Sequence, residues 1–166
     1  MIVYITGGVR SGKSRFAQEK ALQLSKNPVY VATAKIWDDD FAVRVERHKQ
    51  ERGEEWTSLE SEMDIHLLPI AGKVVVIDCV TLWLTNILMK YENIDDSLLA
   101  FQKEINGLVE MDGVFIIVSN EIGMGLHGET ELGRKFTDLQ GWANQYVASV
   151  ANEATLMVSG IPMKLK

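Results

Sequence analysis

The stretch of sequence that decides the fold is residues 7–14, which read Gly7-Gly8-Val9-Arg10-Ser11-Gly12-Lys13-Ser14. It follows an apolar, β-branched run at residues 2–6 and precedes residues 14–24, where apolar side chains recur at helical spacing. The pattern G-x-x-x-x-G-K-[ST] between a strand and a helix is the phosphate-binding P-loop. The alternative is a glycine-rich turn that only connects the two elements. The placement between strand and helix favours nucleotide binding.

Each residue type in this loop suits a bound triphosphate. Glycines at positions 7, 8 and 12 let backbone N–H groups approach the phosphates with no Cβ in the way. The helix that follows directs the positive end of its dipole toward the anion. Lys13 supplies a positive charge for the β- and γ-phosphates, and the Ser14 hydroxyl can ligate Mg²⁺.

Short apolar runs recur along the chain, and each is followed by a helical stretch. We expect strands at residues 2–6, 28–32, 74–78, 114–119 and 155–159, and helices at residues 14–24, 40–51, 81–90, 96–110 and 131–152. The runs are continuous rather than alternating, which is typical of strands covered on both faces. The sequence predicts a single catalytic α/β domain over residues 1–166: a P-loop NTPase-like, doubly wound, mainly parallel sheet flanked by helices. Its functional site should lie at the carboxyl ends of the strands.

Composition narrows the class of protein. The 166 residues carry 17 basic and 23 acidic side chains, a formal charge of −6, which argues against a general nucleic-acid binder. The single cysteine, Cys79, cannot form an internal disulfide and favours a reducing compartment. No apolar run reaches the ~18 residues of a membrane span, and the amino-terminal residues lack the basic stretch of a signal peptide. We expect a cytoplasmic protein with no membrane span and no nucleic-acid partner.

Asp78 ends the third apolar run and is a candidate for the acid that a P-loop enzyme needs near its Mg²⁺. It could instead cap the helix expected at residues 81–90, but the end of a buried strand favours the metal role. Cys79 has no histidine or acid partner for catalysis, so we expect a buried thiol. The sequence has no Asn-Lys-x-Asp segment and no Asp-x-x-Gly switch after the third strand, and the absence of these two marks of regulatory GTPases favours a small kinase over a switch protein.

A basic segment surrounds His48. Arg44 and His48 lie four residues apart on one face of the expected helix, and Arg47, Lys49 and Arg52 flank them. Neighbouring cations favour the neutral imidazole, which has a ring nitrogen able to attack phosphorus. By spacing alone, a solvated basic helix face with an incidental histidine is the simpler interpretation.

Two further features carry weaker signals. Residues 120–125 read Asn-Glu-Ile-Gly-Met-Gly at the end of the fourth run, which suggests a substrate-lining loop or a plain flexible turn. His66 lies among apolar residues and is expected to be structural.

Over nearly its whole length, the sequence resembles the bifunctional adenosylcobinamide kinase / adenosylcobinamide-phosphate guanylyltransferase family of cobalamin biosynthesis. The matching segments are TGGVRSGKS (6–14), YVATA (30–34), RVERHKQER (44–52), DCVTLWLTNIL (78–88), NEIGMG (120–125), GRKFTDLQGWANQ (133–145) and SGIPMKLK (159–166). Many proteins share the P-loop, but the combination of these segments is far more specific. The chain departs from many relatives in two loops, at Gly53 and at residues 126–128.

The resemblance implies two reactions. In the first, the γ-phosphoryl group of ATP or GTP passes to the aminopropanol hydroxyl of adenosylcobinamide. In the second, GTP guanylylates a histidine, and the GMP group then passes to adenosylcobinamide phosphate to give adenosyl-GDP-cobinamide. The guanylylated histidine of the family corresponds to His48, which replaces the simpler interpretation above, and Lys13 is the second catalytic residue. A monofunctional small-molecule P-loop kinase and a nucleotide-dependent regulatory module remain the alternatives.

The resemblance also implies a set of binding residues and a quaternary state. Mg²⁺ would be held by Ser14 and Asp78, directly or through water. Relatives are homo-oligomers, commonly trimers. The nucleotide contacts map to Gly7, Gly8, Val9, Arg10, Ser11, Gly12, Lys13, Ser14, Ala32, Thr33, Ala34, Lys49, Gln50, Glu51, Arg52, Glu60 and Asp78.

Overall fold

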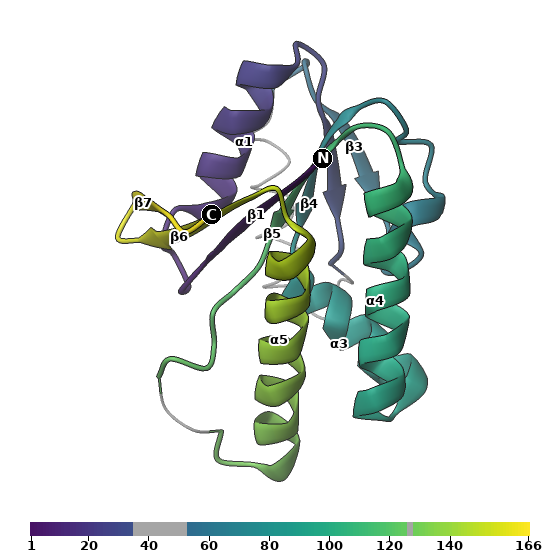
Figure 1. Ribbon diagram of the computed structural model, residues 1–166, viewed down its shortest axis with the longest axis vertical. Coiled ribbons are helices and arrows are strands. Elements are labelled where there is room, and N and C mark those ends of the chain that lie inside the picture. Colours follow the sequence, from purple (N-terminus) through teal and green to yellow (C-terminus); the bar gives the residue numbers. More distant parts are fainter. Residues whose placement is uncertain (35–52, 126–127) are drawn as a thin grey trace.

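A computed structural model describes residues 1–34, 53–125 and 128–166 of the chain. These residues form one seven-stranded sheet in the order β3-β2-β4-β5-β1-β6-β7 (Figure 1). The strands are β1 (Ile2–Gly7), β2 (Val29–Ala32), β3 (Thr57–Glu60), β4 (Val74–Asp78), β5 (Val114–Val118), β6 (Glu153–Val158) and β7 (Ile161–Lys164). The helices are α1 (Lys13–Leu24), α3 (Val80–Tyr91), α4 (Ile94–Glu110) and α5 (Glu131–Val150), with a short 3₁₀ turn, η1, at Ile65–Leu67. All strand pairs are parallel except β6 with β7.

Alternate side chains of the strands enter two separate cores. Ile2 and Tyr4 of β1 belong to the core that α3, α4 and α5 cover, whereas Val3 and Ile5 belong to the core that α1 covers. Figure 1 shows α1 on the opposite side of the sheet from α4 and α5. A strand buried on both faces must be apolar at every position, which explains the continuous apolar runs in the sequence.

The register brings the carboxyl ends of the parallel strands to one edge of the sheet. Asp78 pairs with Ala32 on one side and with Val118 on the other, and Ala32 pairs in turn with Glu60. Ile5 of β1 also lies opposite Val118. Asp78 and Glu60 therefore end their strands at the level of Ile5, two residues before the end of β1, where the phosphate loop begins.

The expected α/β architecture is confirmed, with small shifts at the element ends. The strands expected at residues 2–6, 28–32, 74–78, 114–119 and 155–159 correspond to β1, β2, β4, β5 and β6. The helices expected at residues 14–24, 81–90, 96–110 and 131–152 correspond to α1, α3, α4 and α5. The helix expected at residues 40–51 lies outside the described residues.

Two strands were not expected, and both lie at the edges of the sheet. β3 has mostly exposed side chains, so it lacks the apolar run that marks the buried strands. β7 is exposed along its whole length and carries Pro162, which is tolerated only at an edge. Its hairpin turns at Ser159 and Gly160, which both have positive φ (51° and 82°). The Ser-Gly pair is a hairpin signal that the sequence does contain.

No helix in the described part of the chain is both long and apolar enough to cross a membrane.

Candidate nucleotide-binding site

The phosphate loop joins β1 to α1 at the carboxyl edge of the sheet. Gly7 ends β1 with φ 151°, and a Cβ at this position would collide with the carbonyl oxygen of Met157 on the neighbouring strand. Gly12 has φ 92° and occupies the cap position immediately before α1. These two backbone conformations require glycine, so the motif glycines have a structural reason as well as a ligand-binding one.

Two neighbouring segments hold the loop through backbone hydrogen bonds. The N–H of Gly160, in the β6–β7 turn, donates to the carbonyl oxygen of Ser11 at 3.0 Å. The N–H of Glu121, after β5, donates to the carbonyl oxygen of Gly7 at 3.0 Å. The loop is thus supported on both sides by residues that are more than 100 positions away in the sequence.

Lys13 is buried at the start of α1. Its Nζ donates a hydrogen bond to the carbonyl oxygen of Gly8 at 2.6 Å. Burial lowers the pKa of the Lys13 ammonium, and the negative charge of Asp78 opposes this shift. Because the Asp78 carboxylate acts on the Lys13 ammonium, the two residues belong to one electrostatic site.

Asp78 lies at the end of β4, and its Oδ2 accepts a hydrogen bond from the Tyr30 hydroxyl at 2.8 Å. Asp78 does not cap a helix, which was its alternative role. The residue at the N-cap position of α3 is Cys79, and its side chain makes no capping hydrogen bond. A strand-end carboxylate beside the loop lysine is the arrangement that a phosphate-transferring P-loop enzyme needs.

Thr33 links the ends of β2 and β4. Its hydroxyl accepts the N–H of Cys79 and donates to the carbonyl oxygen of the same residue, both at 2.8 Å. Its own N–H donates to the Asp78 carbonyl at 3.1 Å, and its carbonyl accepts from Asn86 at 2.8 Å. Each polar atom of Thr33 therefore has a partner within the protein. Through these bonds Thr33 holds the backbone at Asp78 and Cys79 against the end of β2.

Cys79 is the buried thiol that was expected. Burial is the largest influence on it and raises the pKa of the Cys79 thiol to about 12, with the Asp78 carboxylate acting in the same direction. A thiol with so high a pKa is almost wholly protonated near neutral pH and is a poor nucleophile.

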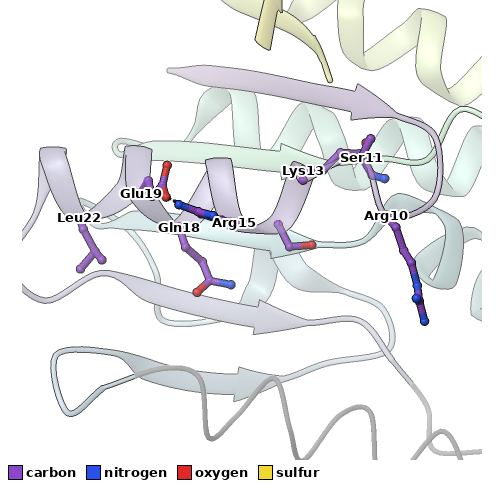
Figure 2. A pocket seen from close by; sticks show the side chains of 9 residues that line it. Arg10, Ser11, Lys13, Arg15, Gln18, Glu19 and Leu22 are labelled. Carbon is purple, nitrogen blue, oxygen red and sulfur yellow. Dashed lines mark hydrogen bonds and ion pairs between the residues drawn. The ribbon is translucent and has the colours of Figure 1, made fainter. Parts of the chain in front are cut away.

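Two cavities adjoin the phosphate loop. The first, of about 570 Å³, runs from the loop along the exposed side of α1, past Arg15, Gln18 and Leu22. Figure 2 shows Arg10, Ser11 and Lys13 of this cavity near the ends to which the parallel strands point. The second, of about 330 Å³, lies between the loop, residues 121–124 and the end of β6. Glu121 and Met124 line it, so the loop at residues 120–125 does border a cavity next to the phosphate loop.

The described residues bring much of the predicted site together. Residues 7–14 form the loop, and Ala32, Glu60 and Asp78 end adjacent strands at the same edge. Thr33 and Ala34 follow β2 directly. His48 and its basic neighbours lie outside the described residues, together with the other predicted contacts in that segment: Arg44, Arg47, Lys49, Gln50, Glu51 and Arg52.

Sequence reasoning missed two groups of side chains around this site. The first is Tyr30, a tyrosine in the otherwise aliphatic strand β2, whose hydroxyl donates to Asp78. A tyrosine among aliphatic residues could have indicated that its hydroxyl has a polar partner. Ser119 and Gln140 are fully buried and hydrogen-bond to each other and to Asn144. The partners of Asn144 outside its own helix, Ser119 and Asn120, come from a distant part of the chain.

The donor set fits Mg²⁺. Ser14 offers a hydroxyl oxygen in the first turn of α1, and Asp78 offers a carboxylate of which only Oδ2 carries the bond to Tyr30. Hard oxygen donors of this kind, completed by water and phosphate oxygens, are what Mg²⁺ prefers.

A phosphate loop, a buried lysine and a strand-end acid on a parallel sheet define a P-loop nucleotide-binding enzyme. Comparison with known proteins is more specific: the chain belongs to the family "Cobinamide kinase / cobinamide phosphate guanyltransferase", whose family model matches residues 3–165. Family membership makes the chain an enzyme with both activities, a kinase and a guanylyltransferase of adenosylcobalamin biosynthesis.

Curated relatives match the chain along its length. The chain is 38% identical to the bifunctional adenosylcobalamin biosynthesis protein CobU of Escherichia coli (strain K12), with 100% of both chains covered. It is 36% identical to the bifunctional adenosylcobalamin biosynthesis protein CobP of Pseudomonas aeruginosa, covering 98% of this chain and 95% of the relative. It is 32% identical to the CobU protein of Salmonella typhimurium, again over 100% of both.

Among solved structures, the flagellar accessory protein FlaH from Methanocaldococcus jannaschii is similar with a TM-score of 0.51 and 16% sequence identity. The match covers 99% of this chain and 77% of that protein. At this level of identity the likeness concerns the fold alone.

Proposed function

We propose that one phosphate loop holds the triphosphate in both reactions, and that His48 carries the GMP group between GTP and the corrinoid acceptor. The observation that carries the proposal is the placement of Lys13 and Asp78: the buried Lys13 side chain bonds to the phosphate loop at the start of α1, and Asp78 ends β4 at the same edge of the sheet. Donors that are fixed before the substrate arrives stabilise developing charge without further reorganisation.

In the kinase step, the aminopropanol hydroxyl oxygen of adenosylcobinamide attacks the γ-phosphorus of ATP or GTP. The bond from that phosphorus to the β–γ bridging oxygen breaks, the nucleoside diphosphate leaves, and the hydroxyl proton is released to water. Lys13 and the backbone N–H groups of residues 7–14 would neutralise charge on the phosphate oxygens. The cavity along α1 begins at this loop and gives the nucleotide a path away from it.

In the guanylyl step, a ring nitrogen of His48 attacks the α-phosphorus of GTP, and pyrophosphate leaves. A phosphate oxygen of adenosylcobinamide phosphate then attacks the same phosphorus, the N–P bond breaks, and adenosyl-GDP-cobinamide forms. The phosphoramidate divides one transfer into two displacements, each with a good leaving group. The four basic neighbours of His48 in the sequence, Arg44, Arg47, Lys49 and Arg52, support this assignment by their charge.

We assign Mg²⁺ to Ser14 and Asp78, directly or through water; when bound, it would neutralise negative charge on the phosphates. The Tyr30 hydroxyl orients the Asp78 carboxylate through its hydrogen bond to Oδ2. Thr33 fixes the backbone that follows Asp78, so it contributes by positioning.

We assign the nucleotide contacts to the described residues 7–14, Ala32, Thr33, Ala34, Glu60 and Asp78 and, in the segment outside them, to residues 49–52. We further infer a homo-oligomer, with a trimer as the expected state, in the cytoplasm with its triphosphate substrates. The exposed apolar side chains Ile161 and Met163 on the edge strand β7 support self-association.

The experiment that tests this function uses GTP labelled in the α-phosphate. Incubation with Mg²⁺ should leave an acid-labile, base-stable label on the protein, and the His48→Ala variant should take none. The matched control is His66→Ala, since His66 lies against Gly107 of α4 and should not affect labelling. Label that persists in His48→Ala would overturn the assignment of His48. A protein that takes no α-label but phosphorylates adenosylcobinamide would be a monofunctional kinase.

A further inference from the structure

A second cluster of polar side chains lies between the turn η1 and the helix α4. Asp64 immediately precedes η1, His66 lies within it, and Glu104 lies on α4. Each of the three side chains offers a ligand atom, and these atoms all lie within 4.8 Å of one another. Two carboxylates and an imidazole are donors that a divalent transition-metal ion accepts in one coordination shell.

The imidazole of His66 has a buried nitrogen that makes no hydrogen bond. Its Nδ1 is inaccessible to solvent and has no hydrogen-bond partner within the described part of the chain. Glu104 Oε2 is 3.9 Å from this nitrogen, which is too far for a hydrogen bond. A Zn–N bond and a Zn–O bond add up to about 4.0–4.3 Å, so one ion can contact both atoms. The separation therefore suits two ligands of one ion better than a direct hydrogen bond.

Glu104 brings a buried carboxylate to the cluster. Its side chain is 7% exposed, and its Oε2 accepts the N–H of Ile65 at 2.8 Å. An ionised carboxylate has about four lone-pair positions, so this bond leaves others for a metal ion. A buried carboxylate needs an opposite charge close to it, and a divalent ion at this place would supply that charge.

Gly107 makes room for the ring of His66. It lies almost one turn after Glu104 on α4, and a Cβ at this position would lie 2.7 Å from Cδ2 of His66 and 2.8 Å from its Cβ. These distances are well below van der Waals contact, so the ring lies against the helix only because residue 107 is glycine. Glycine is less favourable than alanine inside a helix. The helix is therefore weakened at the position that lets the imidazole lie beside Glu104.

A small cavity adjoins the three side chains. Its volume is about 70 Å³, Asp64, His66 and Glu104 line it, and residues 7–14 are not among the described residues around it. A water molecule needs about 10–15 Å³ of such space, so an ion and a water ligand have room. Lys90 and Lys103 also line the cavity. Both are exposed, so their ammonium groups can extend into solvent, where they weaken the binding of a cation without preventing it.

We propose that Asp64, His66 and Glu104 form a binding site for a divalent transition-metal ion such as Zn²⁺, which joins η1 to α4. His66 ligates the ion through Nδ1, the two carboxylates through oxygen, and water completes a four-coordinate shell. Asp64 is exposed, so its carboxylate can turn toward the ion. An ion that binds only the folded chain stabilises it, so the site has a structural role that is independent of the nucleotide chemistry.

The test measures zinc binding to the full chain after a chelator has removed bound metal and has itself been removed. Titration calorimetry in excess Mg²⁺, which prefers sites made of oxygen alone, should show one zinc ion per chain. His66→Ala and Glu104→Gln should each weaken this binding by at least about 100-fold, since a lost ligand costs more than a lost outer partner of a ligand. Glu104→Gln keeps an acceptor for the Ile65 N–H, so it keeps the test decisive if His66→Ala folds poorly.

Gly107→Ala tests the geometry without changing a ligand. The new Cβ would displace the ring of His66, so the zinc affinity should fall by about tenfold or more. His127→Ala, which removes another histidine, and Glu110→Gln, which removes an exposed carboxylate of α4, are the matched controls. Both should leave the zinc affinity within about twofold, because distant and independent sites do not couple.

Thermal unfolding gives a second readout. Zinc at roughly 100 times its Kd should raise the unfolding midpoint of the unaltered protein by about 5 °C or more, and should leave the midpoint of His66→Ala unchanged. Zinc binding that is equally tight in His66→Ala or in Glu104→Gln would overturn the inference. So would an unaltered protein that binds no zinc, in which case the cluster is only a pair of an imidazolium and a carboxylate.

Discussion

The Lys13 ammonium donates a hydrogen bond to the carbonyl oxygen of Gly8, five residues earlier, at 2.6 Å. The bond spans the phosphate loop and holds the ammonium over the backbone that is to receive phosphates. A phosphate oxygen that binds Lys13 competes with this carbonyl. Because an anion favours the charged ammonium, binding also opposes the lowering of the Lys13 pKa by burial.

Replacement of Lys13 by alanine should impair both reactions, because both begin with the triphosphate on the loop. We expect each rate to fall about 10²–10³-fold, the usual effect of removing a group that stabilises transition-state charge. Steady-state phosphorylation of adenosylcobinamide and single-turnover α-labelling measure the two rates separately.

Lys20→Ala is the matched control for this prediction. Lys20 lies on the same helix, and its Nζ pairs with Glu153 at 2.7 Å. Its loss should leave both activities within about twofold, since a partly exposed ion pair contributes little. If Lys13→Ala retained full α-labelling in an assay titrated for active protein, the two reactions would not share the loop.

Replacement of Thr33 by valine should destabilise the protein. The Thr33 hydroxyl bonds to both backbone groups of Cys79 and is fully buried. Valine would leave the N–H and the carbonyl of Cys79 without these partners, at a cost of about 1–3 kcal/mol for each buried group. Urea unfolding monitored by tryptophan fluorescence gives the free energy of unfolding.

Two further variants sharpen the Thr33 measurement. Thr33→Ser keeps the hydroxyl and should recover most of the lost stability. In Thr85→Val, the lost hydroxyl donated to the Thr81 carbonyl one turn earlier in α3, so the free energy of unfolding should fall by less than about 1 kcal/mol. Equal costs for Thr33→Val and Thr85→Val would contradict a special role for the Thr33 bonds.

Glu104 should make stability depend on pH. Burial raises the pKa of the Glu104 carboxyl, although the backbone N–H groups of Asp64 and Ile65 act in the opposite direction. A raised folded pKa means that the folded state holds the proton more tightly than the unfolded chain. The contribution of Glu104 to the free energy of unfolding is therefore full below the unfolded pKa and is lost as pH rises through the folded pKa.

Glu104→Gln removes this titration and keeps an oxygen that can accept the Ile65 N–H, which bonds to Glu104 Oε2 at 2.8 Å. The variant should gain stability relative to the unaltered protein as pH rises from about 4 to about 8. Glu131→Gln is a control in which the stability difference from the unaltered protein should change with pH in the opposite direction, because Lys135 lowers the pKa of this exposed carboxyl. A difference between Glu104→Gln and the unaltered protein that stays constant with pH would exclude the proposed cause.

The buried strands and the phosphate loop could be predicted because their signals are local. A parallel strand covered on both faces is apolar at every position, and the P-loop motif fixes its own place between β1 and α1. The two edge strands were not predicted because they lack such an apolar run: β3 exposes most of its side chains, and β7 exposes all of them. For β7, the local signal in the sequence was the Ser159-Gly160 pair, which is typical of a hairpin turn.

The parts of the site that sequence reasoning missed depend on contacts between distant segments. Thr33 and Cys79 are 46 positions apart, and Tyr30 and Asp78 are 48 apart. Asn120 and Asn144 are 24 apart. Spacing along one helix or strand carries no information on such pairs. Motif matching identified Asp78, Thr33 and residues 120–125, but the sheet register was needed to show which of them face one another.

The central place of β1 has a consequence for the order in which the protein can be built on the ribosome. β1 and the phosphate loop are synthesised before the other strands of the sheet, yet β1 pairs on both sides with strands that begin only at Val114 and Glu153. The backbone groups that hold the loop, at Glu121 and Gly160, appear just as late. The nascent chain must therefore carry β1, a mostly apolar strand, unpaired until those strands have been made, and the sheet is completed only by long-range pairing, which is slow. Of the strands in this sheet, the first to be made is among the last to be paired.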